Sequence, residues 1–266
     1  MQSQLILSTK LTKAKTTQLD NCFVSPPFKL LTLPSHHQLK AIQMSSSPGL
    51  LAGDRLSIQI QLAKNTDLAL STQAFTRVQS MNLGEWAEQH SHFILGENSR
   101  LFYLPHPLVL HKDSEFKQIT QIEMANHSQL IYGEVIAIGR VLNQEKFAFR
   151  SFSSYLKITH QQRPLLLDRI QWHPKKMDLT ALSQMEDFSH QGTFIYLNLA
   201  VETLTLKKQL SELQQTFSDP NLLIGFSLLN EGGFTLRVLG HQAETIEKLF
   251  LQLGETLCES FPCDLP

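Results

Sequence analysis

A seven-residue pattern recurs three times in the middle of the chain, at residues 62–68, 95–101 and 124–130. Its copies read LAKNTDL, LGENSRL and MANHSQL: an apolar residue, a small one, two polar ones, Thr or Ser, any residue and Leu. Asn, Ser and Thr hydrogen-bond their own backbone, so each copy predicts a tight turn. A strand–turn–strand unit that repeats about every 30 residues cannot bury its apolar face alone, so its copies must stack.

The sequence beside these turns is typical of strands. Between Arg55 and Leu62 every second residue is apolar, which predicts a strand with one buried face. Similar β-rich runs follow at residues 68–73, 101–104, 130–138 and 147–158. We therefore predict a mainly β protein, with a layered body of β-helical or solenoid kind over residues 1–180. A β-sandwich would also show short alternating strands and frequent turns, and stays open as an alternative.

The pattern changes in the C-terminal part. Residues 193–201, 222–229 and 234–239 read as strands, with a Gly-containing turn before the last of them. Two apolar stripes at helical spacing predict two helices, one through Leu206, Leu210, Leu213 and Phe217 and one from Ile246 to Leu257. Residues 190–266 are thus predicted as an α+β part, packed on the body or continuous with it, and the polar segment 175–191 is the predicted boundary.

Composition narrows the class of protein. The chain is 42% hydrophobic and 18% charged, which is typical of an ordinary globular protein. A formal charge of −1 gives no reason to expect nucleic acid or an anionic membrane surface as a partner. The sequence has neither a run of about 18 apolar residues nor a basic start before an apolar stretch. We expect no membrane span and no signal peptide, and hence a cytoplasmic protein.

The residues with the most reactive side chains are sparse or scattered. Cys22, Cys258 and Cys263 show no paired spacing, which favours reduced thiols over a disulfide framework. The histidines have no cysteine near them, so we interpret them as surface residues and not as a structural zinc site. The phosphate-binding, dinucleotide, nucleophile-elbow and HExxH motifs are all missing from the sequence, which removes the commonest enzymes.

Four stretches at ordered spacing carry a family resemblance. They are SPGLLAGD at 47–54, STQAFTRV at 71–78, FYLPHP at 102–107, and YGE at 132–134 followed by Gly139, Arg140 and Glu145. Together, over residues 20–200, they resemble the urease accessory protein UreD, also called UreH. The chain keeps Gly49, Gly53 and Asp54 of the first motif. Leu50 and Ala52 replace two of the family's usual glycines, although Leu cannot adopt positive φ as freely as Gly.

The resemblance implies a β-helical fold and a non-catalytic role in the maturation of urease. It implies that the chain binds the accessory protein UreF and, through it, the GTPase UreG, and that this assembly docks on apo-urease. The chain would then be part of a dimeric hetero-oligomer. It also implies an internal route for Ni²⁺, bound weakly and in passing, without an organic cofactor.

Carboxylates are the candidates for that route, because Ni²⁺ accepts carboxylate and imidazole ligands. A protein that passes the metal on should bind it weakly, as scattered carboxylates in a wet interior would. Asp113, Glu134, Glu145 and Asp168 fall on or beside the predicted strands, and Asp54 follows the turn at Gly53. Of these, the positions matching the family motifs are Asp54, Glu134 and Glu145. As alternatives, Asp54 caps a turn, and Glu134 or Glu145 pairs with Arg140 inside the core.

Two prolines stiffen the apolar stretch at residues 104–110. Proline has no N–H to give to a strand ladder, so Pro105, Pro107 and Leu108 form an edge or a surface loop that is a candidate partner-binding site. Core packing at a bend is an equally open interpretation of the same residues.

Two further hypotheses come from other functional classes. A β-helical carbohydrate-active enzyme would use a carboxylate pair, Glu134 with Glu145 or Asp113. Such an enzyme usually has a substrate groove lined by aromatic side chains, and a chain with only two tryptophans does not favour this hypothesis. A metal-free scaffold that binds proteins is the other hypothesis.

Overall fold

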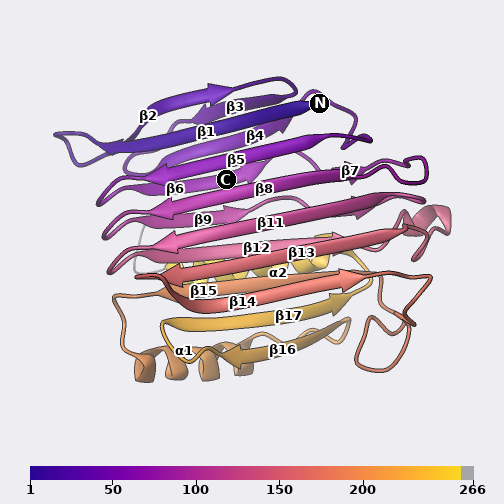
Figure 1. The fold of residues 1–266 in the computed structure, drawn as a ribbon. Helices are drawn as coiled ribbons and strands as arrows, with labels where there is room; N and C mark the ends of the chain where they lie inside the picture. The colour runs from indigo at the N-terminus through magenta and orange to yellow at the C-terminus, as the bar shows by residue number, and fades with distance from the viewer. Residues whose placement is uncertain (259–266) are drawn as a thin grey trace.

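The computed structural model describes residues 1–258 and folds them into two facing β-sheets (Figure 1). The first sheet has seven strands in the order β14–β13–β11–β8–β5–β1–β2, and the second has ten, with the path β16–β17–β15–β12–β9–β6–β4–β3. The first sheet contains β1 (Gln2–Leu11), β2 (Thr17–Val24), β5 (Arg55–Leu62), β8 (Ala87–Leu95), β11 (Glu115–Met124), β13 (Ser151–His160) and β14 (Arg163–Trp172). The second contains β3 (Phe28–Leu33), β4 (Leu39–Ser45), β6 (Asp67–Thr72), β7 (Thr76–Val78), β9 (Arg100–Leu104), β10 (Leu108–Leu110), β12 (Gln129–Ala137), β15 (His190–Asn198), β16 (Leu222–Leu228) and β17 (Gly233–Gly240).

The chain winds as a flattened helix of strands. It leaves a strand of the first sheet, turns, crosses a strand of the second sheet and returns one step further along the stack. Successive strands are therefore parallel neighbours: β5, β8, β11 and β13 in one sheet, and β6, β9 and β12 in the other. Antiparallel strands pair only at the two ends of the stack, as in β1·β2 and β13·β14. Parallel stacking confirms the layered β-helical prediction, because an antiparallel β-sandwich is built from Greek-key connections.

The three copies of the sequence repeat form the turns at one end of this stack. In each copy a fully buried hydroxyl donates to the backbone carbonyl three residues earlier: Thr66 to Ala63 at 2.8 Å, Ser99 to Gly96 at 2.8 Å and Ser128 to Ala125 at 2.7 Å. The residue before each hydroxyl adopts positive φ. Neighbouring turns also bond to each other, since Asn98 Nδ2 donates to Asn65 Oδ1 at 3.0 Å. The repeat thus fixes where each strand ends and the next begins.

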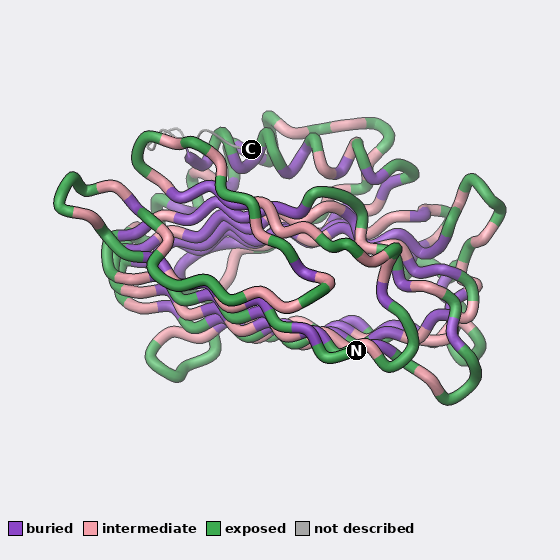
Figure 2. The backbone as a smooth tube through the Cα atoms, turned by 90° about the horizontal axis from the view of Figure 1, so that it is seen from above, coloured by how far each residue is buried: buried purple, intermediate pink, exposed green. Residues whose placement is uncertain are grey.

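Buried and more exposed residues alternate along the strands of the stack (Figure 2), as in β5 and β11, so that every second side chain faces the space between the sheets. In β5 the apolar residues Leu56 to Leu62 point inward, as the alternation predicts, and each is 7% exposed or less. Aromatic rings thicken this core: Phe93 meets Tyr103 edge-on at 5.2 Å between ring centroids. Such pairs add to the stabilisation given by burial alone.

Two helices cover the outer face of the second sheet. α1 (Thr203–Thr216) packs against β16 and β17, and α2 (Ala243–Cys258) packs mainly against β12. Leu206, Leu210 and Leu213 form the buried stripe of α1, as their spacing predicts. This confirms the prediction of two C-terminal helices. In this part of the chain β15 pairs with β12 and extends the second sheet. That residues 190–266 fold as a separate unit stays a prediction.

The motif glycines stand where the backbone requires them. Gly49 (φ 153°) and Gly139 (φ 151°) adopt positive φ, and a side chain at either would collide with a backbone carbonyl, that of Arg77 or Glu145 respectively. Leu50, in place of a family glycine, is 6% exposed and forms a bridge to Val78. Its backbone needs no positive φ, so the substitution is compatible with the turn.

The structure also bears on the predictions about membrane spans and cysteines. None of the helices in residues 1–258 is long and apolar enough to cross a membrane. Cys22 is exposed and Cys258 is buried. Cys263 lies outside the described residues.

Removing one turn hydroxyl should weaken the whole stack. In Ser99→Ala the carbonyl of Gly96 loses its side-chain donor and keeps only the amide of Ser99, which we expect to lower the free energy of unfolding by about 0.5–1.5 kcal/mol. Ser211→Ala is the matched control, since that exposed hydroxyl donates to a carbonyl on the surface of α1. It should change stability by less than about 0.5 kcal/mol. Denaturant titration compares the two variants, and equal effects would contradict a special role for the buried turns.

Candidate functional site

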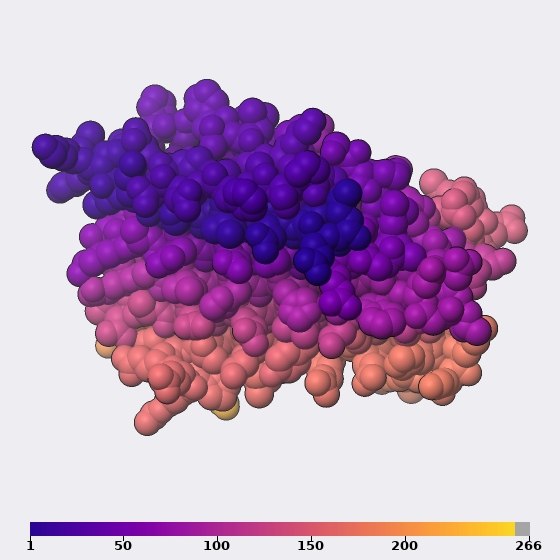
Figure 3. All heavy atoms as spheres, turned by 45° about the horizontal axis from the view of Figure 1, so that its top comes forward, coloured from indigo at the N-terminus to yellow at the C-terminus, as the bar shows by residue number. Residues whose placement is uncertain are grey.

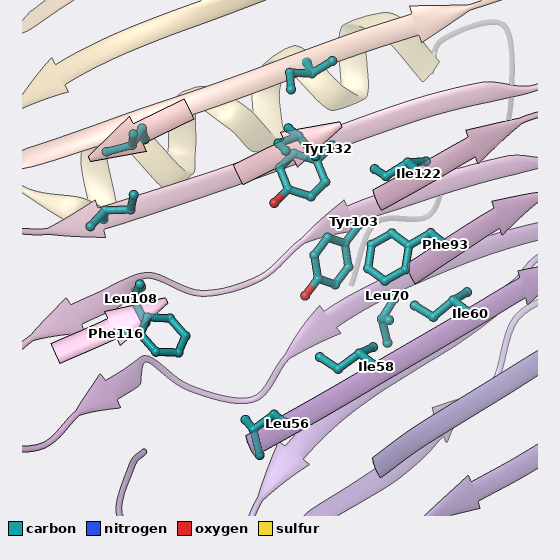
Figure 4. Close-up of a cluster of buried hydrophobic side chains, with 14 of the residues drawn as sticks. Leu56, Ile58, Ile60, Leu70, Phe93, Tyr103, Leu108, Phe116, Ile122 and Tyr132 are labelled. Atoms are coloured by element: carbon teal, nitrogen blue, oxygen red, sulfur yellow. The ribbon is translucent and has the colours of Figure 1, made fainter. Parts of the chain in front are cut away.

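The interior is not apolar throughout. In β8, β11 and β12 the inward side chains near each end of the strand are apolar and those in the middle are polar, whereas the inward row of β5 is apolar throughout. The hydroxyls of Tyr103 and Tyr132 point into this middle, into the gap between Phe93 on one side and Leu108 with Phe116 on the other (Figure 4). The polar side chains that line it include Gln43, Thr72, Gln89, Ser91, Gln118, Thr120 and Glu134. A polar band therefore runs through an otherwise apolar core.

The polar band contains two neighbouring cavities. One of about 50 Å³ lies deep inside, where it is lined by Glu134, Gln118 and the two tyrosines. The other, of about 220 Å³, extends from Asp54 to Gln89. They share the lining residues Gln43, Thr72, Thr76 and Gln89. Both are large enough for water, which needs about 10–15 Å³ and polar partners.

Glu134 is the carboxylate of the inner cavity. It stands on β12, where alternation turns it inward between Tyr132 and Ile136. Gln118 Nε2 donates a hydrogen bond to its Oε1 and a second, of 2.9 Å, to the hydroxyl of Ser154. Burial raises the pKa of Glu134 to about 7, although the hydrogen bond from Gln118 and the charge of Arg237 lower it. Near neutral pH this carboxyl therefore exchanges a proton readily.

The neighbouring groups offer neutral oxygen atoms. Burial holds the pKa of both Tyr103 and Tyr132 well above the ordinary range, with the charge of Glu134 acting in the same direction, so both phenols stay protonated. Gln43 lines both cavities, and its Oε1 has no hydrogen-bond partner within residues 1–258. A buried acceptor without a donor is costly, and a cation or a water molecule would satisfy it.

An ion pair ends the polar band at the C-terminal side of the stack. Arg237 on β17 donates to Asp168 of β14 at 2.5 Å and to the hydroxyl of Thr193 at 2.5 Å. The Arg237 side chain is 39% exposed, so this end of the band reaches solvent. Arg237 and Asp168 also act on the pKa of Glu134, which they lower and raise respectively.

The other two predicted nickel ligands lie elsewhere. Asp54 lines the larger cavity, but its Oδ2 accepts a hydrogen bond of 2.8 Å from the amide of Leu51, which is the turn-capping role kept as an alternative. Glu145 is at the surface and pairs with Arg140 through both carboxylate oxygens. The expected Arg140 pair is thus made by Glu145 outside the core. Only Asp54 and Glu134 line the connected cavities.

The proline-rich segment is largely interior. β10 begins at Leu108, which is 7% exposed, and pairs with both β12 and β7. Pro107 is buried as well, and Pro105 lines the inner cavity. Burial favours core packing at a bend over a partner-binding edge. His106 sits between the prolines, where its amide donates to the hydroxyl of Thr72 at 2.8 Å.

The arrangement does not form a glycosidase pair. Glu134 lies inside the stack, whereas Glu145 is engaged by Arg140 on the surface and Asp113 lies in a turn with φ 60°. Trp172 is a core residue against Phe152, with 5.5 Å between ring centroids, and lines no groove. No cluster of three or more His, Cys, Asp or Glu occurs within residues 1–258.

The sequence indicated some of these residues and missed others. Glu134 came from a motif, and Asp168 was seen only as an acidic residue on a strand. Arg237 and Thr193 were missed because Arg237 bonds to Asp168 and to Thr193 across strands that the sequence separates widely. The sequence signal that could have identified them is a charged or hydroxyl side chain at an inward position of a strand whose other inward residues are apolar.

A two-sheeted β-helical body with a polar interior and a helical cover on one sheet defines the structural class of this protein. The family model of the UreD urease accessory protein matches residues 2–264. The chain is 62% identical over 263 residues to the urease accessory protein UreD of Actinobacillus pleuropneumoniae serotype 5b (strain L20), with 97% of each chain covered. It is 60% identical over 268 residues to UreD of Haemophilus influenzae (strain 86-028NP), with 97% of this chain and 99% of that protein covered.

The chain therefore belongs to the UreD family of urease accessory proteins. It is a maturation factor and not an enzyme, as the sequence predicted. Membership implies interaction with the machinery that matures urease.

The raised pKa of Glu134 predicts a pH-dependent stability. The native state holds this proton up to about pH 7, whereas the unfolded chain releases it near the ordinary value of 4.5. The native state thus binds more protons between these values, and the free energy of unfolding falls as pH rises through them. Glu134→Gln abolishes this loss, so the variant should gain up to about 3 kcal/mol over the wild type between pH 4 and 8.

Denaturant titrations of both proteins across this pH range provide the measurement. Glu247, whose pKa is also raised to about 7 by burial and by Glu244, contributes the same slope to both proteins. The difference between the two curves therefore isolates Glu134. Parallel curves would show that its pKa is not raised.

Proposed function

We propose that this chain helps to load nickel into urease by letting Ni²⁺ pass through its polar interior. In this proposal it binds UreF, and through UreF the GTPase UreG, and the assembly docks on apo-urease in the cytoplasm. The observation that carries the proposal is a single carboxylate, Glu134, in a cavity whose other polar lining consists of hydroxyls, side-chain amides and the imidazole of His106. Its relatives' name as urease accessory proteins supports the same role.

The composition of the cavity favours passage over storage. Ni²⁺ accepts imidazole and carboxylate ligands, and this cavity offers one of each, Glu134 and His106, beside neutral oxygens. So few strong ligands would hold the ion loosely. Such an ion keeps part of its water shell, for which the two cavities have room. Gln43, with its unpaired oxygen, joins the two cavities and gives the ion a second ligand between Asp54 and Glu134.

Replacing Glu134, the carboxylate of the inner cavity, should reduce nickel transfer without dissociating the complex of this chain with its partners. Glu134→Ala and Glu134→Gln each remove the charge from the cavity, and we expect slower nickel loading per urease by about tenfold, the equivalent of about 1.4 kcal/mol of lost interaction. Nickel per urease is measured by atomic absorption, and complex formation by co-purification. Glu145→Gln is the matched control, since it alters a motif carboxylate outside the cavities.

The variants also separate a route from a structural role. If Glu134→Gln folds and assembles normally but loads nickel at the wild-type rate, the internal route is wrong. Loss of folding or assembly in Glu134→Gln would instead assign Glu134 a structural role. An effect of Glu145→Gln equal to that of Glu134→Gln would place the route outside the cavities.

The maturation role itself has a direct test. Urease is co-expressed with its other accessory proteins, with and without this chain, and its nickel content and activity are measured. Urease should stay poor in nickel until the chain is supplied. Equal nickel content in both samples would refute a role in nickel loading.

A metal-free scaffold is the remaining alternative. It would support assembly by protein contacts alone, and calorimetric titration with Ni²⁺ distinguishes it from a nickel route. Heat of binding that Glu134→Gln diminishes favours the route. No binding, for the chain alone or in complex, favours the scaffold.

A further inference from the structure

An ion that passes through the interior must enter at one place and leave at another. The cavity of about 220 Å³ opens to solvent beside the exposed residues Phe75 and Arg77, and the inner cavity of about 50 Å³ continues from it to Glu134. Beyond Glu134 the polar band goes on to the C-terminal side of the stack, but neither Thr193 nor Arg237 is among the residues that line the inner cavity. The inner cavity is therefore closed on this side.

In the second sheet a row of inward side chains leads from the inner cavity to the C-terminal side of the stack, which β14, β16 and β17 form opposite β1 to β4 (Figure 1). This side is the orange part of the surface in Figure 3, opposite the indigo N-terminal part. Glu134 pairs with Thr193, and Thr193 pairs with Arg237, so three neighbouring strands place these side chains on the same face.

Arg237 is the last side chain of this row before solvent. Thr193 is 4% exposed, whereas the side chain of Arg237 is 39% exposed. The next position of the row, on the edge strand β16, is Gly225. A side chain there would have only the backbone carbonyl of Arg237 within 4 Å, at 3.9 Å, so the space beyond Arg237 is open.

The first sheet supplies the carboxylate that faces Arg237. Gln118 of β11 donates to the hydroxyl of its cross-strand partner Ser154 on β13, at 2.9 Å, and Asp168 follows on β14. One arm of the Arg237 guanidinium, Nη2, donates to Asp168 Oδ1 at 2.5 Å, and the other, Nη1, donates to Thr193 Oγ1 at 2.5 Å. The guanidinium thus bridges the two sheets where the polar band ends.

This bridge places a permanent positive charge on the path of a cation. A guanidinium is not deprotonated in proteins, so a change of pH does not remove the charge. Glu134 lies two strands away from Arg237, which is about 10 Å at the usual spacing of strands. The charge of Arg237 lowers the pKa of Glu134 and that of Asp168 raises it, so the inner carboxylate and the bridge are within electrostatic reach. A cation beside Glu134 would be repelled by Arg237 and attracted by Asp168.

We propose that Arg237 and Asp168 form a gate that closes a second mouth of the interior. In the closed state Arg237 occupies the carboxylate of Asp168 and keeps a cation from leaving. In the open state the Arg237 side chain moves into the solvent that it already reaches, and Asp168 becomes a ligand for the passing ion. Ni²⁺ thus replaces the guanidinium at Asp168. The inference rests on the proposed function and deepens it by locating the exit of the route.

Variants of the two partners separate a gate from an ordinary ion pair. Arg237→Gln removes the charge but keeps a donor for Thr193, and Arg237→Lys keeps the charge. Asp168→Asn breaks the same ion pair but leaves the positive charge in place. Arg169→Gln is the matched control, because Arg169 is the next residue of β14 and its guanidinium lies over the ring of Tyr155, 5.4 Å from the centroid.

Release of Ni²⁺ is measured with the first mouth blocked. All proteins compared are full chains that carry Ala74→Cys, because Ala74 is exposed and lines the cavity of about 220 Å³. A bulky maleimide is attached after loading with Ni²⁺, and rapid mixing with a chelating dye then gives the rate of release. Denaturant titration shows that each variant is folded, and Arg237→Met replaces Arg237→Gln if the latter is not.

Loss of the positive charge should open the second mouth. Arg237→Gln should release Ni²⁺ about tenfold faster than the unsubstituted gate, because the repulsion is gone. Arg237→Lys and the Arg169→Gln control should release it at the unsubstituted rate. Asp168→Asn should be no faster, because it loses a ligand and keeps the charge. A purely structural ion pair would instead make Arg237→Gln and Asp168→Asn behave alike.

The outcomes distinguish failure of the gate from failure of the proposed function. The gate is wrong if Arg237→Gln releases Ni²⁺ no faster than the control, if Asp168→Asn is accelerated equally, or if the blocked chain with an unsubstituted gate releases Ni²⁺ as fast as the unblocked one. In each of these cases Ni²⁺ is still bound through Glu134. If the wild type binds no Ni²⁺ that Glu134→Gln weakens, the proposed function fails and the gate fails with it.

Discussion

Every strand in the centre of this protein depends on the chain returning to the same place after each coil. The buried hydroxyl of each repeat turn enforces that return, because it donates a hydrogen bond to the carbonyl three residues earlier, where the strand ends. With the turn positions fixed, the register of the parallel strands follows, and Leu68, Leu101 and Leu130 stack on one another. A slip by one residue would turn the whole inward row of a strand to solvent.

The same register makes a polar interior possible. Inward positions at one depth of the stack carry Gln89, Gln118 and Ser154 from one sheet and Thr72 and Glu134 from the other. Such groups are costly to bury, yet each successive coil adds another at the same depth, so they satisfy one another or face a shared cavity. The polar band therefore arises from the repetition of the coil, and the apolar rows on either side of it arise in the same way.

The sequence predicted the architecture well because its signals are local. A turn pattern repeated three times and strict alternation in Arg55–Leu62 suffice for stacked strands, and helical stripes suffice for α1 and α2. The interior site was only partly predictable. Glu134 belongs to a short motif, but the partnership of Asp168 with Arg237 depends on how far the second sheet extends beyond the first. Burial of Pro107 and Leu108 likewise depends on the short parallel pairing of β10, which proline-containing sequences do not reveal.

The helical cover has a consequence for motion. Both faces of β12 are buried, one by the core and the other by α2, and a side chain at Gly133 would collide with Leu104 and crowd Phe250 of α2. Hydrogen-bonded neighbours also flank the strand on each side. Its backbone amides should therefore be among the slowest in the molecule to exchange with solvent deuterium. Glu134 is thus carried by the most rigid strand, a fixed point around which the loops at the end of the stack can fluctuate.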